Sequence, residues 1–265
     1  MKKSAAPEHA TEHLPLISNR FVYMATAMVA FLALLSVAIN LGGRKLGAEM
    51  ALAGHSDSTQ DFLVTIGQDH LRLAANTLRF ETQRRDGPAE RADLYLLWPE
   101  MSGYRSELRA RFDDVTQSGG LIFIQLSQST MSRDMSGRVE PIYSHLFDGP
   151  AEKGLYGLTL HRLKSDAGYG NEVLLTAPRP GGPDFAVRCL LPAAGTPASS
   201  GDCQRDVHVG RDLSVLYRFS SSLLSDWAQI DDAVRRYVTA RIDAEPQLPS
   251  NSPKIPEKPA RNDSL

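Results

Sequence analysis

The hydrophobic pattern of the chain is dominated by one uninterrupted apolar segment near its N-terminus. Residues 21–41 carry no charged side chain, and the first basic residues on either side are Arg20 and Arg44. At about 1.5 Å per residue, a helix over this segment extends about 31 Å, which matches the roughly 30 Å hydrocarbon core of a bilayer. The pattern therefore predicts a transmembrane helix over residues 21–41.

The residues around this segment favour an uncleaved anchor over a cleaved signal peptide. The apolar part of a signal peptide usually spans about 7–15 residues and follows a basic segment, whereas Glu8 and Glu12 precede this one. The small-residue site at 51–53 lies beyond Arg44 and Lys45. The basic residues of the head give a slight positive-inside bias. We therefore predict an inner-membrane protein with its N-terminus in the cytoplasm and residues 46–265 in the periplasm.

Beyond the apolar segment, short runs of alternating or continuous apolar residues are typical of strands. They predict a hairpin over 62–80 with its turn at 68–70, followed by strands at 92–98, 121–127, 155–163, 171–177 and 185–191. Residues 207–219 contain a similar turn pattern followed by a strand that ends at Phe219. Turns rich in Gly and Pro separate these runs, as expected for a mainly antiparallel sheet.

Two segments have helical spacing instead. From Ser102 onward, Tyr104, Leu108, Phe112 and Val115 fall on one face, and a second apolar stripe begins near Ser222 and should lie on the sheet. The predicted fold class is α+β, with one inserted helix and one C-terminal helix. The predicted organisation is a cytoplasmic head (1–20), the membrane helix (21–41), a juxtamembrane stalk (42–58), a periplasmic domain (59–244) and a disordered proline-rich tail (245–265).

One short pattern occurs twice. Residues 64–69 read Val-Thr-Ile-Gly-Gln-Asp, and residues 207–212 read Val-His-Val-Gly-Arg-Asp. Either the domain contains a degenerate repeat, or two hairpins share the same turn chemistry because Gly and Asp tolerate the required backbone angles. The sequence leaves both interpretations open.

Two cysteines, Cys189 and Cys203, follow the apolar segment. The residues between them are rich in Pro, Gly and Ser, which predicts a flexible loop that can bring the two sulfurs together. A bridge closing a loop of about 15 residues stabilises the fold by roughly 3 kcal/mol in chain-entropy models. We predict a disulfide, which agrees with a periplasmic domain; the alternative is two free thiols.

Composition and motifs argue against several classes of function. The chain has 29 basic and 31 acidic residues, so its charge gives no reason to expect a nucleic-acid partner. The five histidines beyond the apolar segment have no partners at metal-ligand spacing, and the sequence contains no nucleophile elbow or phosphate loop. These histidines are His55, His70, His145, His161 and His208. We therefore predict no catalytic residues, no metal and no cofactor. An enzyme would need residues that meet only in space.

The longest predicted loop covers residues 129–154, and loops longer than about 12–15 residues are unusual in a compact domain. Loops of this length are commonly functional. Its polar and aromatic side chains form a candidate recognition surface, in which an arginine offers a fork to a carboxylate or phosphate. The members of this surface are Arg133, Asp134, Arg138, Tyr143 and His145. The alternative is that Arg133 and Asp134 tie the loop to the domain.

Three segments resemble bacterial single-pass "transmembrane anchored" proteins of uncharacterised function. They are residues 93–104 (DLYLLWPEMSGY), residues 131–143 (MSRDMSGRVEPIY) and residues 207–219 (VHVGRDLSVLYRF) with the following Trp227. The resemblance implies an anchor followed by one envelope-facing domain, and it carries over no activity.

The sequence favours a non-catalytic domain that is held at the lipid bilayer of the inner membrane and binds an envelope protein or a cell-wall polymer. One alternative is an accessory subunit of a transporter or sensor. Another is an anchored hydrolase or transferase whose site no motif reveals.

Overall fold

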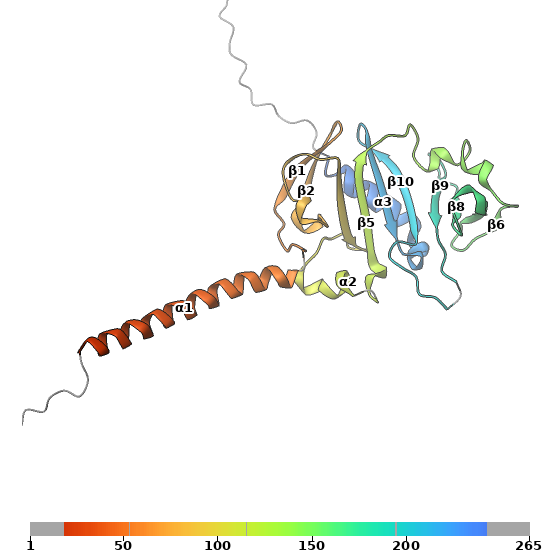
Figure 1. Cartoon of the computed structure of the whole chain (residues 1–265). Coiled ribbons are helices and arrows are strands. Elements are labelled where there is room, and N and C mark those ends of the chain that lie inside the picture. Colours follow the sequence, from red (N-terminus) through yellow and green to blue (C-terminus); the bar gives the residue numbers. More distant parts are fainter. Residues whose placement is uncertain (1–18, 53, 115, 194, 243–265) are drawn as a thin grey trace, which may run out of the picture. The chain divides into compact units, whose positions relative to one another are not determined.

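The computed structural model describes residues 19–52, 54–114, 116–193 and 195–242 (Figure 1). The predicted cytoplasmic head up to residue 18 and the predicted tail at 245–265 lie outside these residues. The chain divides into two units, residues 1–53 and residues 54–265, which are described separately.

The first unit consists of one helix, α1 (Asn19–Leu52). Its segment Asn19–Ile39 is long and apolar enough to cross a membrane, by length and composition. The side chains of this segment are all exposed. Exposed apolar side chains along a helix are unfavourable in water, and their burial in an apolar environment would be favourable.

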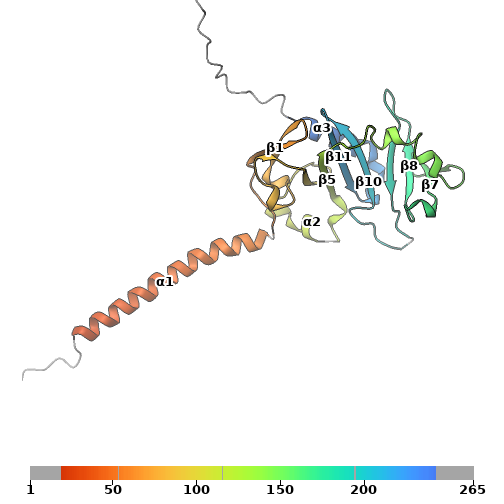
Figure 2. The same ribbon diagram turned by 45° about the horizontal axis from the view of Figure 1, so that its top comes forward.

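The second unit is built around an antiparallel sheet of eight strands, in the order β4-β5-β11-β10-β9-β8-β7-β6 (Figure 1, Figure 2). In that order the strands are Arg91–Leu97, Leu121–Gln128, Leu213–Phe219, Cys203–Val209, Phe185–Cys189, Val173–Ala177, Thr159–Arg162 and Glu152–Lys153. A smaller sheet, in the order β2-β1-β3, comprises Asp69–Ala74, Asp61–Ile66 and Gly87–Pro88.

The main core lies between the larger sheet and helix α3 (Trp227–Thr239). In β11 every second residue is buried, which is the period of a strand with one face in the core. The helix contributes Ile230, Val234 and Val238 to the same core. Each fully buried side chain of this size stabilises the fold by about 1.5–3 kcal/mol. The predicted α+β class with a C-terminal helix is therefore confirmed.

The inserted helix is shorter than its apolar spacing predicts. The described residues form a 3-10 turn (Ser106–Leu108), the short helix α2 (Arg109–Asp113) and a second 3-10 turn (Ser118–Gly120), while Val115 lies outside them. Tyr104 lies ahead of them and its side chain is buried. Its backbone amide donates a hydrogen bond to the carbonyl oxygen of Asn76 at 2.8 Å. A tertiary hydrogen bond therefore replaces the predicted first helical turn.

The contacts of the domain begin at Gly54, ahead of residue 59 where we predict its start. The His55 ring stacks on Tyr104 with 4.4 Å between ring centroids. One ring nitrogen of His55 lies 2.9 Å from the Tyr95 hydroxyl and the other lies 2.7 Å from Asp113 Oδ1. These contacts fix the chain to the domain directly after residue 53.

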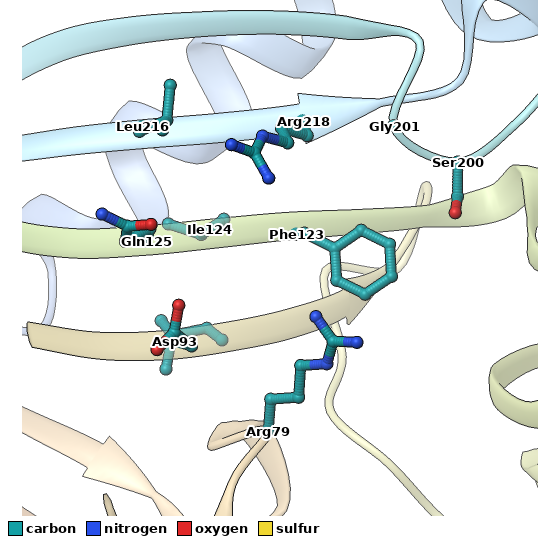
Figure 3. A pocket seen from close by; sticks show the side chains of 10 residues that line it. Arg79, Asp93, Phe123, Ile124, Gln125, Ser200, Gly201, Leu216 and Arg218 are labelled. Carbon is teal, nitrogen blue, oxygen red and sulfur yellow. The ribbon is translucent and has the colours of Figure 1, made fainter.

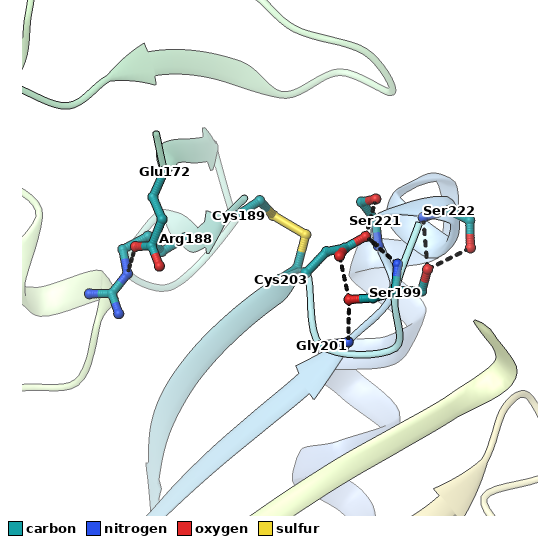
Figure 4. The surroundings of a disulfide bond; sticks show 10 residues. Glu172, Arg188, Cys189, Ser199, Gly201, Cys203, Ser221 and Ser222 are labelled. Carbon is teal, nitrogen blue, oxygen red and sulfur yellow. Dashed lines mark hydrogen bonds and ion pairs between the residues drawn. A yellow bond between two sulfur atoms is a disulfide. The ribbon is translucent and has the colours of Figure 1, made fainter. Parts of the chain in front are cut away.

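The disulfide between Cys189 and Cys203 is present, as predicted (Figure 4). The two residues face each other on β9 and β10, with their Cα atoms 4.0 Å apart. Only this pair and the neighbouring pair of Arg188 and Gln204 join the two strands. The disulfide therefore reinforces a narrow junction of the sheet, between β4-β5-β11-β10 and β9-β8-β7-β6.

The twice-occurring sequence pattern forms two turns that bind each other. Asp69 of the first turn accepts hydrogen bonds from the backbone amides of Arg211 and Asp212, at 3.0 Å each. Asp212 in return accepts from the amide of Gln68 at 2.9 Å. Shared turn chemistry therefore has a physical reason here, because each aspartate caps the turn that carries the other.

The glycines of these turns have positive φ, and an added Cβ at Gly210 would lie 2.4 Å from Asp69 Oδ1. We expect Gly210→Ala to destabilise the full-length protein by at least about 2 kcal/mol, from backbone strain together with displacement of Asp69. Urea unfolding in detergent measures this. The control is Gly168→Ala, at a similar φ with open space around it, which should cost about 1 kcal/mol. Equal losses would show that the contact between the turns adds nothing.

Candidate functional site

The face of the sheet opposite α3 carries polar side chains over β4, β5, β11 and β10. We call this surface the open face. Its side chains form cross-strand rows: Phe123 lies opposite Tyr95 and Arg218, and Gln125 lies opposite Asp93 and Leu216. A third row contains Arg91, Ser127, Ser214 and His208. These residues alternate with core positions, so they project away from α3.

The same face is covered over the other half of the sheet. Leu174 and Ala186 alternate with the core residues Leu175 and Val187, and they pack in a second apolar cluster with Met135 and Tyr143. Met135 and Tyr143 belong to the 129–154 segment, which includes short 3-10 turns at Ser136–Arg138 and Tyr143–Leu146. The long loop therefore covers β8 and β9, and its Arg138 lies beside β10. The last residues of the segment form the edge strand β6.

Three of the five residues of the predicted recognition surface point toward the domain. The Arg138 side chain is 14% exposed and pairs with Asp206 on β10. Tyr143 is 4% exposed. Asp134 accepts the amide of Gly137 at 3.1 Å and faces Arg235 of α3 at 3.8 Å. Arg138 and Tyr143 hold the loop on the sheet, and Asp134 faces α3.

The remaining two, Arg133 and His145, are exposed on the loop. Their role in recognition stays a prediction. The structure does not bring all five residues onto one accessible surface.

Beneath the loop lies a buried charged cluster that the sequence analysis did not find. Asp231 of α3 is 0% exposed and accepts hydrogen bonds from Tyr217 Oη at 2.6 Å, Arg205 Nε at 2.8 Å and Arg235 Nε at 3.1 Å. Arg179 also pairs with Asp231. Arg205 is itself 1% exposed. The sequence could have revealed this burial, because Arg205 lies between Cys203 and Val207 at the two-residue spacing of side chains on one face of a strand.

The environment of Asp231 keeps it ionised. Burial alone raises the pKa of Asp231, but the charge of Arg205, the hydrogen bond from Tyr217 and the charge of Arg235 outweigh burial and hold the pKa well below its usual range. Burial also raises the pKa of Tyr217 well above its usual value, so the phenol stays a donor. Asp231 therefore stays a carboxylate and Tyr217 a neutral phenol at neutral pH, so the two remain acceptor and donor in the network.

We expect Asp231→Asn to destabilise the protein by about 3–5 kcal/mol, because Arg205 would stay buried without its carboxylate. The matched control is Asp232→Asn. Asp232 is 57% exposed and lies 3.5 Å from Arg179, so its loss should cost less than about 1 kcal/mol. Urea unfolding at neutral pH compares the two variants, and similar losses would contradict a central role for Asp231.

The same network predicts a dependence on pH. The folded pKa of Asp231 is depressed, so its contribution is fully present above the unfolded value of about 3.9 and is lost as the pH falls below it. We expect the free energy of unfolding, measured from about pH 5 down to about pH 2, to fall more steeply with decreasing pH for the wild type than for Asp231→Asn. Parallel curves would contradict this.

The open face contains a groove of about 300 Å³ (Figure 3). The Phe123 ring forms its floor at one end, with Arg79 on one side and Arg218 on the other. The guanidinium carbon of Arg79 lies 5.0 Å from the centroid of Phe123 and 5.2 Å from that of Phe80. Gln125, Asp93 and Ser200 complete the polar lining.

The charges of the groove do not cancel. Asp93 is already paired, since Arg91 Nε lies 3.0 Å and Gln83 Nε2 lies 2.8 Å from Asp93 Oδ2. Among the described residues, the guanidinium groups of Arg79 and Arg218 have no carboxylate or hydrogen-bond partner. The groove therefore carries uncompensated positive charge beside an aromatic ring. Within the same described part of the chain, no group of three metal-ligating side chains occurs.

No family model and no curated protein matches this chain. Two solved structures are similar to part of it. Smlt3025, an immunity protein of the Stenotrophomonas maltophilia type IV secretion system, is 21% identical, with a TM-score of 0.45 over 70% of this chain and 93% of its own. The iron-regulated outer membrane lipoprotein FrpD of Neisseria meningitidis is 8% identical, with a TM-score of 0.41 over 71% of this chain and 96% of its own. At these values the similarity carries no argument about function, which rests on the residues described above.

Proposed function

We propose that this protein is a membrane-anchored binding domain of the bacterial cell envelope. In this proposal α1 spans the inner membrane with its N-terminus in the cytoplasm. The domain from Gly54 onward lies in the periplasm and binds another envelope component, a protein or a cell-wall polymer, on its open face.

The observation that carries the binding role is the unequal covering of the sheet. The 129–154 segment packs over the outer face of β8 and β9, whereas the outer face of β4, β5 and β11 keeps a groove with uncompensated positive charge. A partner that supplied negative charge there would gain binding energy without first breaking an ion pair within the domain.

Two further observations support the location. The exposed apolar segment Asn19–Ile39 has the length and composition of a membrane span. The disulfide between Cys189 and Cys203 agrees with an oxidising compartment, because cytosolic thiols are normally kept reduced.

The orientation is tested with reporters fused after Leu265. We expect a fluorescent protein that matures only in the cytoplasm to be dark and a periplasmic phosphatase to be active, because the proposed topology exports the domain. Alkylation of the denatured protein without reductant should leave Cys189 and Cys203 unmodified. A bright reporter with an inactive phosphatase would show the opposite topology, and two modified cysteines would remove the support from the disulfide.

The binding face is tested by photocrosslinking of the full-length protein in its native membranes. A benzophenone amino acid at Gln125, on the open face, should give a discrete adduct, because a partner there lies within reach. The matched control is Gln229, an exposed glutamine of α3 on the other side of the sheet, where we expect none. The same benzophenone amino acid at Arg133 tests whether the exposed part of the 129–154 loop also contacts the partner. Equal labelling at Gln125 and Gln229 would contradict a role for the open face.

A further inference from the structure

We propose that the groove between Arg79 and Arg218 binds an acidic side chain of a protein partner, whose neighbouring apolar side chain packs on Phe123. This inference rests on the proposed function, because it places the partner on the open face and names the chemistry by which the partner is held.

The first argument is the supply of donors. Arg79 lies beside the rings of Phe80 and Phe123, an arrangement that restricts the guanidinium while leaving its N–H groups free to donate. Arg218 projects from β11, a central strand paired on both sides, directly opposite Phe123. Both arginines are thus carried near one aromatic ring, with their hydrogen-bonding capacity unused among the described residues. A carboxylate is a suitable acceptor for such groups.

The second argument distinguishes these two arginines from others on the same sheet. Arg138 pairs with Asp206, Arg188 pairs with Glu172 and Arg205 pairs with Asp231. These three pairs hold the domain together. Arg79 and Arg218 make no corresponding pair within the described part of the chain, so their charge is available to a partner.

The third argument favours a polypeptide over a phosphate-rich surface. The groove also contains Asp93 and Gln125, and Asp206 lies in the same cross-strand row, beyond Leu216. Because Asp93 and Asp206 are already paired with Arg91 and Arg138, only the two guanidinium groups carry uncompensated charge, which suits a single carboxylate rather than a dense array of phosphates. A mixture of donors, acceptors and an aromatic surface suits the alternating polar and apolar groups of a peptide, and Arg with aromatic residues is enriched at protein interfaces.

The test selects random phage-displayed peptides on the full-length protein in nanodiscs of neutral lipid. We expect the enriched peptides to share an Asp or Glu next to an apolar residue. Changing that acid to its amide, Arg79→Gln, or Arg218→Gln should each weaken binding about tenfold or more, as for a lost hydrogen bond to a charged group. Combining an arginine variant with the amide peptide should weaken binding little further, because both changes remove the same interaction.

The control is Arg236→Gln, which removes an exposed arginine of α3 and should leave binding unchanged. The inference is overturned if the Arg79→Gln/Arg218→Gln double variant enriches the same peptides, or if no acidic peptide is enriched over that variant. It is also overturned if inorganic phosphate or phosphatidylglycerol vesicles, rather than peptides, bind through these arginines.

The outcome also separates this inference from the proposed function. If acidic peptides fail while the adduct at Gln125 persists, the open face binds a partner by other chemistry and only the inference is lost. If the adduct at Gln125 is absent as well, both are lost.

Discussion

The architecture of the domain depends on the buried ion pair between Arg205 and Asp231. Two buried charged side chains are tolerated only when they pair with each other and additional hydrogen bonds satisfy their remaining polar atoms. Here Tyr217, Arg235 and Ser136 supply them. These groups come from two strands, α3 and the 129–154 segment, and they meet where the pairing of β9 with β10 ends. Arg205 also donates a hydrogen bond to the carbonyl oxygen of Ala186 on β9. The ion pair therefore couples the helix, the loop and both halves of the sheet.

This coupling determines which part of the outer face of the sheet stays uncovered. Once Ser136 is bound to Arg205 and Arg138 to Asp206, the loop lies against β10 and covers the outer face of β8 and β9. The neighbouring strands keep their outer face uncovered. The boundary of the open face is thus set by the same contacts that stabilise the core, so loss of the ion pair should disturb the loop and the edge of the binding face together.

Local patterns predict the strands, the C-terminal helix and the disulfide, because alternation, helical spacing and a flexible loop between cysteines are properties of nearby residues. They do not predict pairing between distant ones. Tyr104 has helical spacing but bonds to Asn76, and Arg138 looks like a free guanidinium until β10 brings Asp206 beside it. The repeated Gly-x-Asp turns were visible in the sequence, yet only the fold shows that Asp69 and Asp212 cap each other's turns.

Because local patterns do not predict pairing between distant residues, the sequence favours the loop as the recognition surface, whereas the contacts in the structure favour the sheet. The sequence marks Arg133, Arg138, Arg79 and Arg218 as equally polar residues, and only their three-dimensional partners distinguish them. Arg138 is neutralised by an aspartate of the domain, whereas Arg79 and Arg218 border a groove whose one aspartate, Asp93, is already paired with Arg91. A charge satisfied inside the domain contributes to its stability, and a charge left unsatisfied on a rigid strand contributes to recognition. Applied to this sheet, that distinction is the physical reason for proposing β11 and the residues facing it as the binding surface.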